Sequence, residues 1–259
     1  MYFMDITRIL HLSTFAGEIM LQSGAEIYRV EETVYRICVS YGLKEVDVFA
    51  TPTGIIISAT DKNNNTISKV KRIKSRTVDL DKVSRVNNLS RDICTKNLSL
   101  ALVQASLENI NKSEKYSKKT IFIASSIVAG FFTLVYGGNS RDFIVSLFIG
   151  PIIQFFSILL CKIQTNSFFI NALGGAIASF IALLGTSIGV GHSTDHIVIG
   201  SVMLLVPGLI ITNAIRDTIE GDLITGLTRA SEAFLIAIAI ALGSGVVFSL
   251  WLYLGGKYQ

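Results

Sequence analysis

The chain has 259 residues, of which half are hydrophobic and 16% are charged, and its formal net charge is +4. Together with a mean hydropathy of +0.54, this composition argues against a soluble globular protein and indicates a membrane protein. Most lysine and arginine residues precede residue 120, but they form no arginine-rich or aromatic-interleaved patch. Nucleic-acid binding is therefore not indicated.

The first predicted elements are two helices. Apolar residues at helical spacing predict a helix over residues 5–20. The sequence Ser23-Gly-Ala-Glu26 matches a capping box, in which each side chain accepts a hydrogen bond from the other residue's N–H, and it predicts the start of a second helix. This helix is expected to run to about Tyr41, with Gly42 as its left-handed end.

A small sheet is predicted next. Residues 46–49, 54–59 and 66–73 have the alternating or apolar patterns of short strands, and a polar turn joins the last two. These patterns indicate a three-stranded antiparallel sheet. Helical spacing returns over residues 79–96 and 98–110. Residues 1–115 are therefore expected to form an α+β domain outside the bilayer.

The second half of the chain carries five apolar segments, each near the ~20 residues that cross a bilayer core. We expect residues 116–259 to form a transmembrane helical domain with spans over residues 120–136, 143–160, 168–188, 197–215 and 233–254. Four lysines directly before the first span place the linker in the cytoplasm: Lys112, Lys115, Lys118 and Lys119. The expected fold class is an α-helical polytopic membrane protein with an N-terminal cytoplasmic α+β domain.

Small residues predict close helix packing in the last segment, where Ala233, Ala237, Ala241 and Gly245 recur at four-residue intervals. Such a stripe lets helix backbones approach, because dispersion rather than the hydrophobic effect drives helix association in lipid. We interpret the stripe as internal packing rather than as a partner interface.

The fourth apolar segment is the most informative about function. Pro207 cannot donate a backbone hydrogen bond and Gly208 adds flexibility, so the helix is expected to break near the middle of this crossing. Broken backbone survives in a bilayer only where protein or water covers it, which is typical of the substrate path of a transporter. The alternative interpretation is a proline kink followed by an ordinary cytoplasmic loop.

Polar residues follow this break. Asn213 and Arg216 lie at the end of the segment, where polar groups need partners. Arg216 can bind the carboxylate of a substrate, or it can pair with Glu220 one helical turn later. Asp217, Asp222 and Glu232 can relay protons in exchange for substrate, although a solvated loop acid is the alternative for Asp222.

Charged residues also cluster at the start of the second helix, where Glu26, Arg29 and Glu31 follow one another closely. Capping accounts for Glu26, and an ion pair with Glu26 or Glu32 accounts for Arg29. The sequence Thr51-Pro-Thr-Gly54 is typical of a turn that enters a strand. Spacing alone favours structural roles for all of these residues.

Signals for catalysis and metal binding are weak. The sequence contains no HExxH motif and no glycine-rich phosphate loop, and Cys38, Cys94 and Cys161 form no CxxC pair. The residues His192, Asp195 and His196 can hold a metal weakly, but a solvated loop also explains them. We therefore expect no enzyme activity, no cofactor and no metal site.

Taken in order, the polar motifs resemble those of the bacterial threonine/serine exporter family. The matching stretches are Ser23-Gly-Ala-Glu-x-Tyr-Arg-Val-Glu31, Thr51-Pro-Thr-Gly54, Leu205-Val-Pro-Gly208, Asn213-Ala-Ile-Arg-Asp217, Gly221-Asp222 and Gly226-Leu-Thr-Arg229. The resemblance implies a cytoplasmic domain and about five spans in the bacterial inner membrane, and secondary transport of small amino acids or of dicarboxylates such as succinate. Full-length members carry a second membrane region, so the resemblance also implies that this chain is the separately encoded first half and has a small hydrophobic membrane subunit as partner.

The sequence thus predicts a proton-coupled secondary transporter subunit that exports a small carboxylate-bearing metabolite. The alternative is a membrane-tethered sensor or regulatory subunit without transport activity of its own. The predicted substrate path, in which Arg229 rests on the resemblance, comprises Pro207, Gly208, Asn213, Arg216, Asp217, Asp222 and Arg229. The predicted cytoplasmic motif comprises Glu26, Arg29, Glu31, Thr51, Pro52 and Gly54.

Overall fold

The computed structural model describes residues 6–113 and 116–256, and the chain divides into two compact units. Unit 1 comprises Met1–Lys115 and Leu209–Ala230, and unit 2 comprises Tyr116–Gly208 and Ser231–Gln259. Asp5 and Lys115, which enter the sequence predictions, lie outside the described residues. The limits of a cytoplasmic domain at residues 1–115 and of a transmembrane domain at residues 116–259 stay a prediction, because packing alone does not show which residues lipid surrounds.

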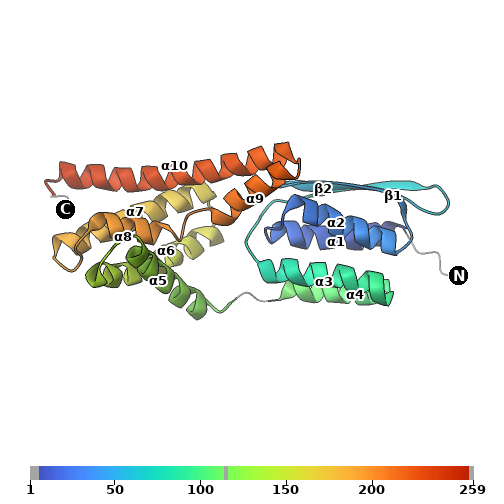
Figure 1. Cartoon of the computed structure of the whole chain (residues 1–259), viewed down its shortest axis with the longest axis horizontal. Helices are drawn as coiled ribbons and strands as arrows, with labels where there is room; N and C mark the ends of the chain where they lie inside the picture. Colours follow the sequence, from blue (N-terminus) through green and yellow to red (C-terminus); the bar gives the residue numbers. More distant parts are fainter. Residues whose placement is uncertain (1–5, 114–115, 257–259) are drawn as a thin grey trace. The chain divides into compact units, whose positions relative to one another are not determined.

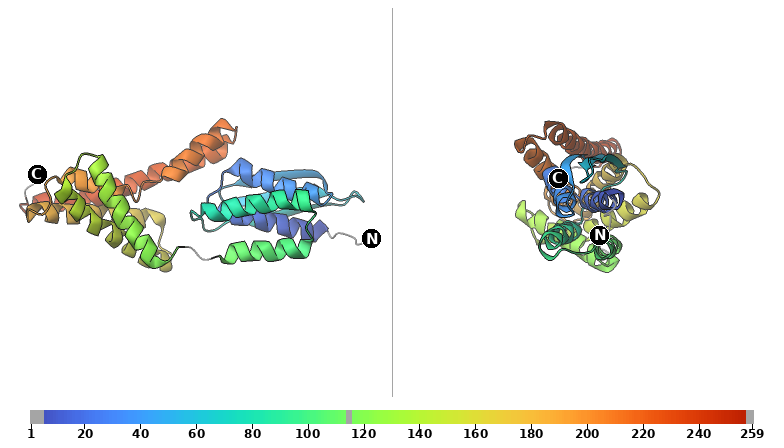
Figure 2. Two further views of the ribbon diagram at one scale, coloured as in Figure 1. Left: turned by 60° about the horizontal axis from the view of Figure 1, so that its bottom comes forward. Right: turned by 90° about the vertical axis from the view of Figure 1, so that its right-hand side faces the viewer.

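The N-terminal part of unit 1 has three layers (Figures 1 and 2). The first layer is an antiparallel sheet in the order β1-β2-β3. The second is a pair of helices, α1 and α2, and the third is the pair α3 and α4. The bounds are α1 Ile6–Gln22, α2 Ile27–Ser40, β1 Lys44–Thr51, β2 Gly54–Thr60, β3 Thr66–Arg72, α3 Leu80–Lys96 and α4 Leu100–Lys112. The predicted sheet and its flanking helices are confirmed.

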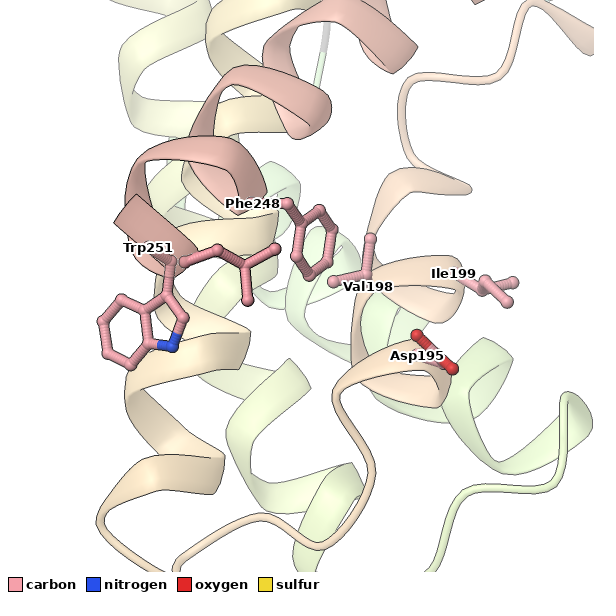
Figure 3. Close-up of a pocket in the computed structure, with 6 residues that line it drawn as sticks. Asp195, Val198, Ile199, Phe248 and Trp251 are labelled. Atoms are coloured by element: carbon pink, nitrogen blue, oxygen red, sulfur yellow. The ribbon is translucent and has the colours of Figure 1, made fainter. Parts of the chain in front are cut away.

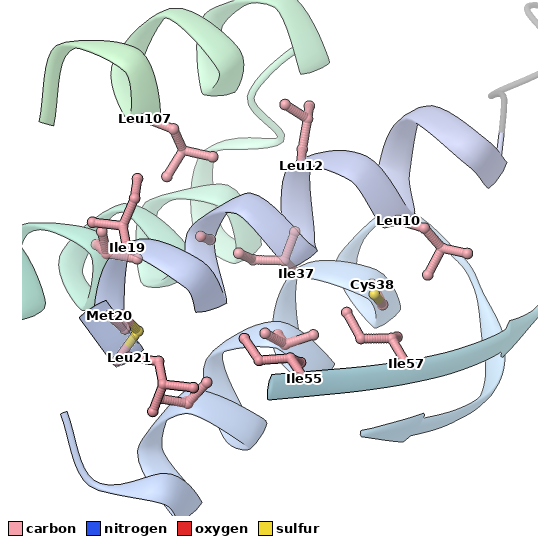
Figure 4. Close-up of a cluster of buried hydrophobic side chains, with 14 of the residues drawn as sticks. Leu10, Leu12, Ile19, Met20, Leu21, Ile37, Cys38, Ile55, Ile57 and Leu107 are labelled. Carbon is pink, nitrogen blue, oxygen red and sulfur yellow. The ribbon is translucent and has the colours of Figure 1, made fainter. Parts of the chain in front are cut away.

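Alternation along the central strand explains how the sheet joins the helices. Ile55 and Ile57 of β2 are fully buried against the helix pair (Figure 4). Gly17 on α1 leaves room for Val34 of α2 and for Ile55, because a Cβ at Gly17 would lie 2.7 Å from the side chain of Val34 and 3.0 Å from that of Ile55. Burial of each such isoleucine stabilises the fold by roughly 1.5–3 kcal/mol. Gly42 has φ +81°, which confirms the predicted left-handed end of the second helix.

The predicted capping box is wrong. Helix α2 begins at Ile27, its N-cap is Glu26, and the side chain of Glu26 accepts no capping hydrogen bond. The N–H of Ser23 completes the end of α1 by donating to the carbonyls of Ile19 and Met20. The physical reason is that the Glu26 carboxylate binds two guanidinium groups, those of Arg29 and Arg216, instead of a backbone N–H.

Unit 2 contains the helices α5 (Lys118–Val135), α6 (Ser140–Lys162), α7 (Ser167–Ser187) and α8 (Thr194–Val202). It also contains residues 231–253 of α10 (Leu223–Tyr253). Its small apolar core is formed by α6, α7 and α8 and consists of Val145, Ile149, Ile153, Ala178, Ala182 and Ile197. Most other large apolar side chains of these helices are exposed, as expected for helices that face lipid.

Glycines set the distances between the helices of unit 2. A Cβ at Gly200 on α8 would lie 2.4 Å from the backbone nitrogen of Thr133 on α5, and one at Gly150 on α6 would lie 2.2 Å from the carbonyl oxygen of Ser125. The closest approach joins α7 and α10, where a Cβ at Gly243 would lie 1.8 Å from the carbonyl oxygen of Ala172. Each contact exists only because the side chain is absent.

The predicted small-residue stripe on the last helix has the wrong register. Ala233 is buried, but Ala237, Ala241 and Gly245 are exposed, and Gly245 has open space around its Cβ position. The packed face instead carries Ala239 and Gly243. Four-residue spacing predicted close packing correctly, but it could not show which face meets α7.

The prediction of five crossing helices is also corrected. Within the described residues, four helices are long and apolar enough to cross a membrane: Lys118–Val135, Ser140–Lys162, Ser167–Ser187 and Leu223–Tyr253. The fourth predicted span, residues 197–215, is divided between α8 and α9 (Gly208–Ile219), with non-helical residues around Pro207. The predicted break is confirmed, but the two parts are short helices that belong to different units.

Candidate functional site

Five of the seven predicted path residues lie on a helical hairpin in unit 1. Helix α9 ends at Ile219, and α10 begins at Leu223. Gly221 allows the turn between them because it has φ +99°, and the N–H of Asp222 closes the turn by donating to the carbonyl of Asp217 at 2.8 Å. Gly226 then lets α10 approach α9, since a Cβ there would lie 3.0 Å from the carbonyl oxygen of Ala214. We call residues 209–230 the α9–α10 hairpin.

A buried ion pair holds the inner side of the hairpin. The Arg229 guanidinium lies 3.1 Å from the Asp217 carboxylate, and the two side chains are 5% and 0% exposed. Asp217 also accepts a hydrogen bond of 3.3 Å from the N–H of Ile27, at the start of α2. Arg229 donates to the carbonyl of Ala25 at 2.9 Å. The pair therefore joins both hairpin helices to the loop between α1 and α2.

The same loop is bound by two further hairpin residues. Asn213, which is 5% exposed, donates from its side-chain amide to the carbonyl of Gly24 at 3.0 Å. Arg216 pairs with Glu26, whose carboxylate also binds Arg29 at 2.8 Å. The ion pair between Arg29 and Glu26 confirms one of the two partners that the sequence predicted for Arg29. The predicted pairing of Arg216 with Glu220 is replaced by this long-range contact with Glu26.

Electrostatics make Asp217 a candidate proton-binding group. Burial raises the pKa of the Asp217 carboxyl, and the charges of Asp222 and Glu26 raise it further, whereas Arg229 and the Ile27 N–H act in the opposite direction. A carboxyl with a raised pKa takes up a proton at a higher pH. Protonation would remove the negative charge that Arg229 faces, and would leave a buried guanidinium able to bind another anion.

Glu31 is a second carboxylate of this type. It accepts a hydrogen bond of 2.7 Å from the N–H of Ala50 and so joins α2 to the end of β1. Burial raises the pKa of Glu31, the hydrogen bond from Ala50 lowers it, and the charge of Asp222 raises it. The charge of Asp222, at the hairpin turn, therefore acts on Glu31 of α2.

The remaining predicted residues have other positions. Thr51, Pro52 and Gly54 form the turn between β1 and β2, in which the Thr51 hydroxyl donates to the Gly54 carbonyl at 3.4 Å. Pro207 precedes α9, and Gly208 is its first residue. The structure thus brings together Asn213, Arg216, Asp217 and Arg229 with Glu26 and Arg29.

Sequence reasoning missed the backbone side of this network. In this network, the carbonyls of Gly24 and Ala25 accept hydrogen bonds and the N–H of Ile27 donates one. Backbone groups are common to all residue types, so the sequence gives no signal for them. The one available signal was their position directly inside the Ser23-to-Glu31 motif.

The loop that carries the suspected metal ligands is bound by a carboxylate of α6. The backbone N–H groups of His192 and Ser193 donate to the buried Asp142 carboxylate at 2.6 and 3.0 Å. Within the described residues, no group of three or more His, Cys, Asp or Glu side chains is placed to hold a metal ion. The histidine loop is thus held through its backbone.

A hollow of about 380 Å³ lies elsewhere, in unit 2, between α8 and the last turns of α10 (Figure 3). Its lining is mostly apolar, with one carboxylate, and consists of Asp195, Val198, Ile199, Phe248, Trp251 and Leu252. None of the predicted path residues contributes to it.

The four long apolar helices define a polytopic α-helical membrane protein. The family model described as "Putative threonine/serine exporter" matches residues 11–251. The chain belongs to this family, which confirms the resemblance seen in its motifs.

Several relatives show how the match is distributed. The chain is 24% identical over 242 residues to the "Probable threonine/serine exporter" of Mycobacterium tuberculosis, covering 91% of this chain and 45% of the relative. It is 21% identical to the "Threonine/serine exporter" of Corynebacterium glutamicum, covering 95% and 52%. It is 22% identical to the "Probable succinate transporter subunit YjjP" of Escherichia coli, covering 94% of each chain. The chain thus spans about half the length of the two exporters. No solved structure matches it.

Proposed function

We propose that the chain is a subunit of a proton-coupled secondary transporter that exports a small carboxylate-bearing metabolite. The relatives' names support two substrate classes, threonine or serine and a dicarboxylate such as succinate. The two classes share a carboxylate group. The observation that carries the proposal is the buried pair of Asp217 and Arg229, with the more exposed Arg216 one turn from Asn213 on the same hairpin.

Proton binding and substrate binding are coupled because the Arg229 guanidinium can pair either with Asp217 or with the substrate carboxylate. When Asp217 binds a proton it loses its charge, and a substrate carboxylate takes its place beside the guanidinium. Charge is conserved, because one proton enters as one carboxylate binds. When Asp217 loses the proton, it again competes for Arg229 and the substrate leaves. Arg216 supplies a second guanidinium at a position that is 46% exposed, where it can meet the substrate first.

We place this transporter in the bacterial inner membrane with its N-terminus in the cytoplasm. The lysines before α5 and in its first turn support this orientation, because positive charge near a span favours the cytoplasmic side. We also infer a small hydrophobic membrane subunit as partner. The chain covers 94% of a relative that is itself named a subunit and 45–52% of the two exporters, and this difference in coverage supports the inference.

The partner is tested first. The tagged chain is purified from its native membrane, and any small membrane protein that co-purifies is identified and co-expressed with it. Sealed vesicles containing both proteins, the chain alone or the partner alone are then given a pH gradient and labelled threonine or succinate. We expect gradient-dependent flux of one of the two compounds with both proteins present. Absence of flux of both would overturn the transport proposal, and equal flux by the partner alone would favour the sensor alternative.

The residues are tested by alanine substitution. Arg216→Ala should lower the flux by roughly tenfold, the equivalent of about 1.5 kcal/mol for a hydrogen bond to a charged group. Arg36→Ala is the matched control, because Arg36 also forms a surface ion pair, with Glu32 on α2. Equal flux in the two variants would remove Arg216 from the substrate path. Membrane insertion should be unchanged in both.

A further inference from the structure

The outer face of the unit 1 sheet carries an exposed apolar row. Phe49, Ile56 and Val70 are aligned across the three strands, since Phe49 pairs with Ile56 and Ile56 pairs with Val70. Their side chains point away from the buried Ile55 and Ile57, and they are 54%, 45% and 70% exposed. A contiguous exposed apolar group on a folded domain typically marks an interaction site.

An acidic and a basic residue lie on diagonally opposite sides of this row. Asp47 is two residues from Phe49 on β1, and Arg72 is two residues from Val70 on β3. The two strands are antiparallel to β2 and lie on its two sides, so the residues fall on opposite sides of Ile56. Both are exposed, and within the described residues neither side chain has a hydrogen bond or an ion pair. We call these five residues the sheet patch.

We propose that the sheet patch binds the same patch of a second copy of the chain. A two-fold axis through Ile56 in the plane of contact, perpendicular to the line from Asp47 to Arg72, places each Asp47 over Arg72 of the other copy. The two apolar rows then meet at the centre. Such isologous contacts are the commonest in homo-oligomers, and stacked sheets pack about 10 Å apart.

The neighbouring residues permit a close approach of the two sheets. Gly54, Ser58 and Ser68 flank the apolar row, and the two serines satisfy each other through a hydrogen bond of 3.1 Å. The basic residues Lys69 and Lys71 lie on the other face, where Lys71 pairs with Glu18 of α1. A surface with one acid and one base at opposite corners is complementary to itself, whereas an anionic membrane would favour a basic rim. The proposal does not depend on the transport activity.

Crosslinking of the full chain in its own membrane tests this contact. The background carries Cys94→Ser and Cys161→Ser, which leaves the buried Cys38. Ile56→Cys is treated with a short bis-maleimide, because facing sheets about 10 Å apart exceed the reach of a disulfide. The control is Leu102→Cys on α4, which is 51% exposed. We expect a crosslinked dimer for Ile56→Cys and none for Leu102→Cys. A monomer, equal crosslinking of both variants, or a crosslink to another protein would overturn the proposal.

Charge reversal in the Ile56→Cys chain identifies the occupant. Asp47→Arg and Arg72→Asp should each lower the crosslinked fraction by roughly fivefold or more, because each substitution places like charges opposite each other twice. The double reversal restores both contacts only if the partner is a second copy, and it should recover the crosslinked fraction of the parent. A double variant as poor as the single ones would overturn the assignment.

Discussion

Helix α10 makes two different kinds of contact along its length. Its first turns belong to the α9–α10 hairpin, and its later turns contact α7. In unit 1, charged and amide side chains bind α9 and the first turns of α10 to the loop before α2. In unit 2, the later turns of α10 meet α7 where side chains are missing, at Gly243 and Gly175. The first contact depends on charge, and the second depends on volume.

This difference indicates which of the two contacts can respond to the binding of a proton or an anion. A buried ion pair changes when a proton or an anion arrives, because each alters the charge on one partner. A contact between glycine and backbone has no titratable group and responds only to added atoms. We therefore propose that coupling takes place in the hairpin and that the glycine contacts take no part in it. The predictions below test this separation.

The largest effect is expected for Arg229→Ala. The substitution leaves the Asp217 carboxylate buried without its counter-charge, and breaking a buried pair in this way typically costs about 3–5 kcal/mol. Thermal unfolding of the purified full chain in detergent measures the loss.

Arg216→Ala is the matched control for Arg229→Ala. It removes an arginine from the same hairpin, but the Arg216 side chain is 46% exposed, and ion pairs at the surface contribute about 0–1 kcal/mol. Equal losses of stability in the two variants would show that burial of the pair is not what holds the hairpin.

The next effect is expected for Gly243→Ala. A single added methyl group would lie 1.8 Å from the carbonyl oxygen of Ala172, so α7 and α10 must move apart, at a cost of about 1–3 kcal/mol. The measurement is again the unfolding midpoint of the full chain.

Gly245→Ala, two residues later on the same helix, controls for the change in helix propensity, because nothing lies within 4 Å of its Cβ position. We expect it to be neutral or slightly stabilising. If Gly243→Ala were equally harmless, the close approach of the two helices would be refuted.

The smallest effect concerns pH and Glu31. Burial raises the folded-state pKa of Glu31 above its ordinary 4.5, so the folded chain binds this proton more tightly than the unfolded chain does. The stability contributed by Glu31 is therefore complete below the ordinary pKa and is lost as pH rises through the folded pKa. As pH is lowered from about 7.5 to about 5, the thermal unfolding midpoint of the parent should thus rise relative to that of Glu31→Gln. A constant difference across this range would contradict the raised pKa.

Local patterns predicted much of the fold. The strands and helices of residues 6–113 follow from short-range periodicity and turn residues, and the sequence contains both signals in full. The break at Pro207 was predicted for the same reason, because a missing N–H acts locally. The capping box was wrong because Glu26 has a stronger partner, Arg216, that lies 190 residues away in the chain.

Long-range geometry explains the other differences. Four-residue spacing marked Gly245 on α10, but α7 contacts the face that carries Gly243, and the choice of face depends on the neighbour. The site motifs contained Asn213, Arg216, Asp217 and Arg229, but not their partners, which are mainly backbone groups before α2. The residues of the candidate site were thus accessible from sequence, while their grouping required the fold.

The most direct test of the proposed proton coupling at the hairpin is to record internal pH in sealed vesicles that contain the chain and any small membrane protein that co-purifies with it. We predict that addition of threonine or succinate moves protons across the membrane. We also predict that Arg216→Ala lowers this movement by roughly tenfold and that Arg36→Ala leaves it unchanged. Substrate flux without any change in internal pH, or an unchanged signal in Arg216→Ala, would contradict the coupled binding of a proton and a carboxylate at this site.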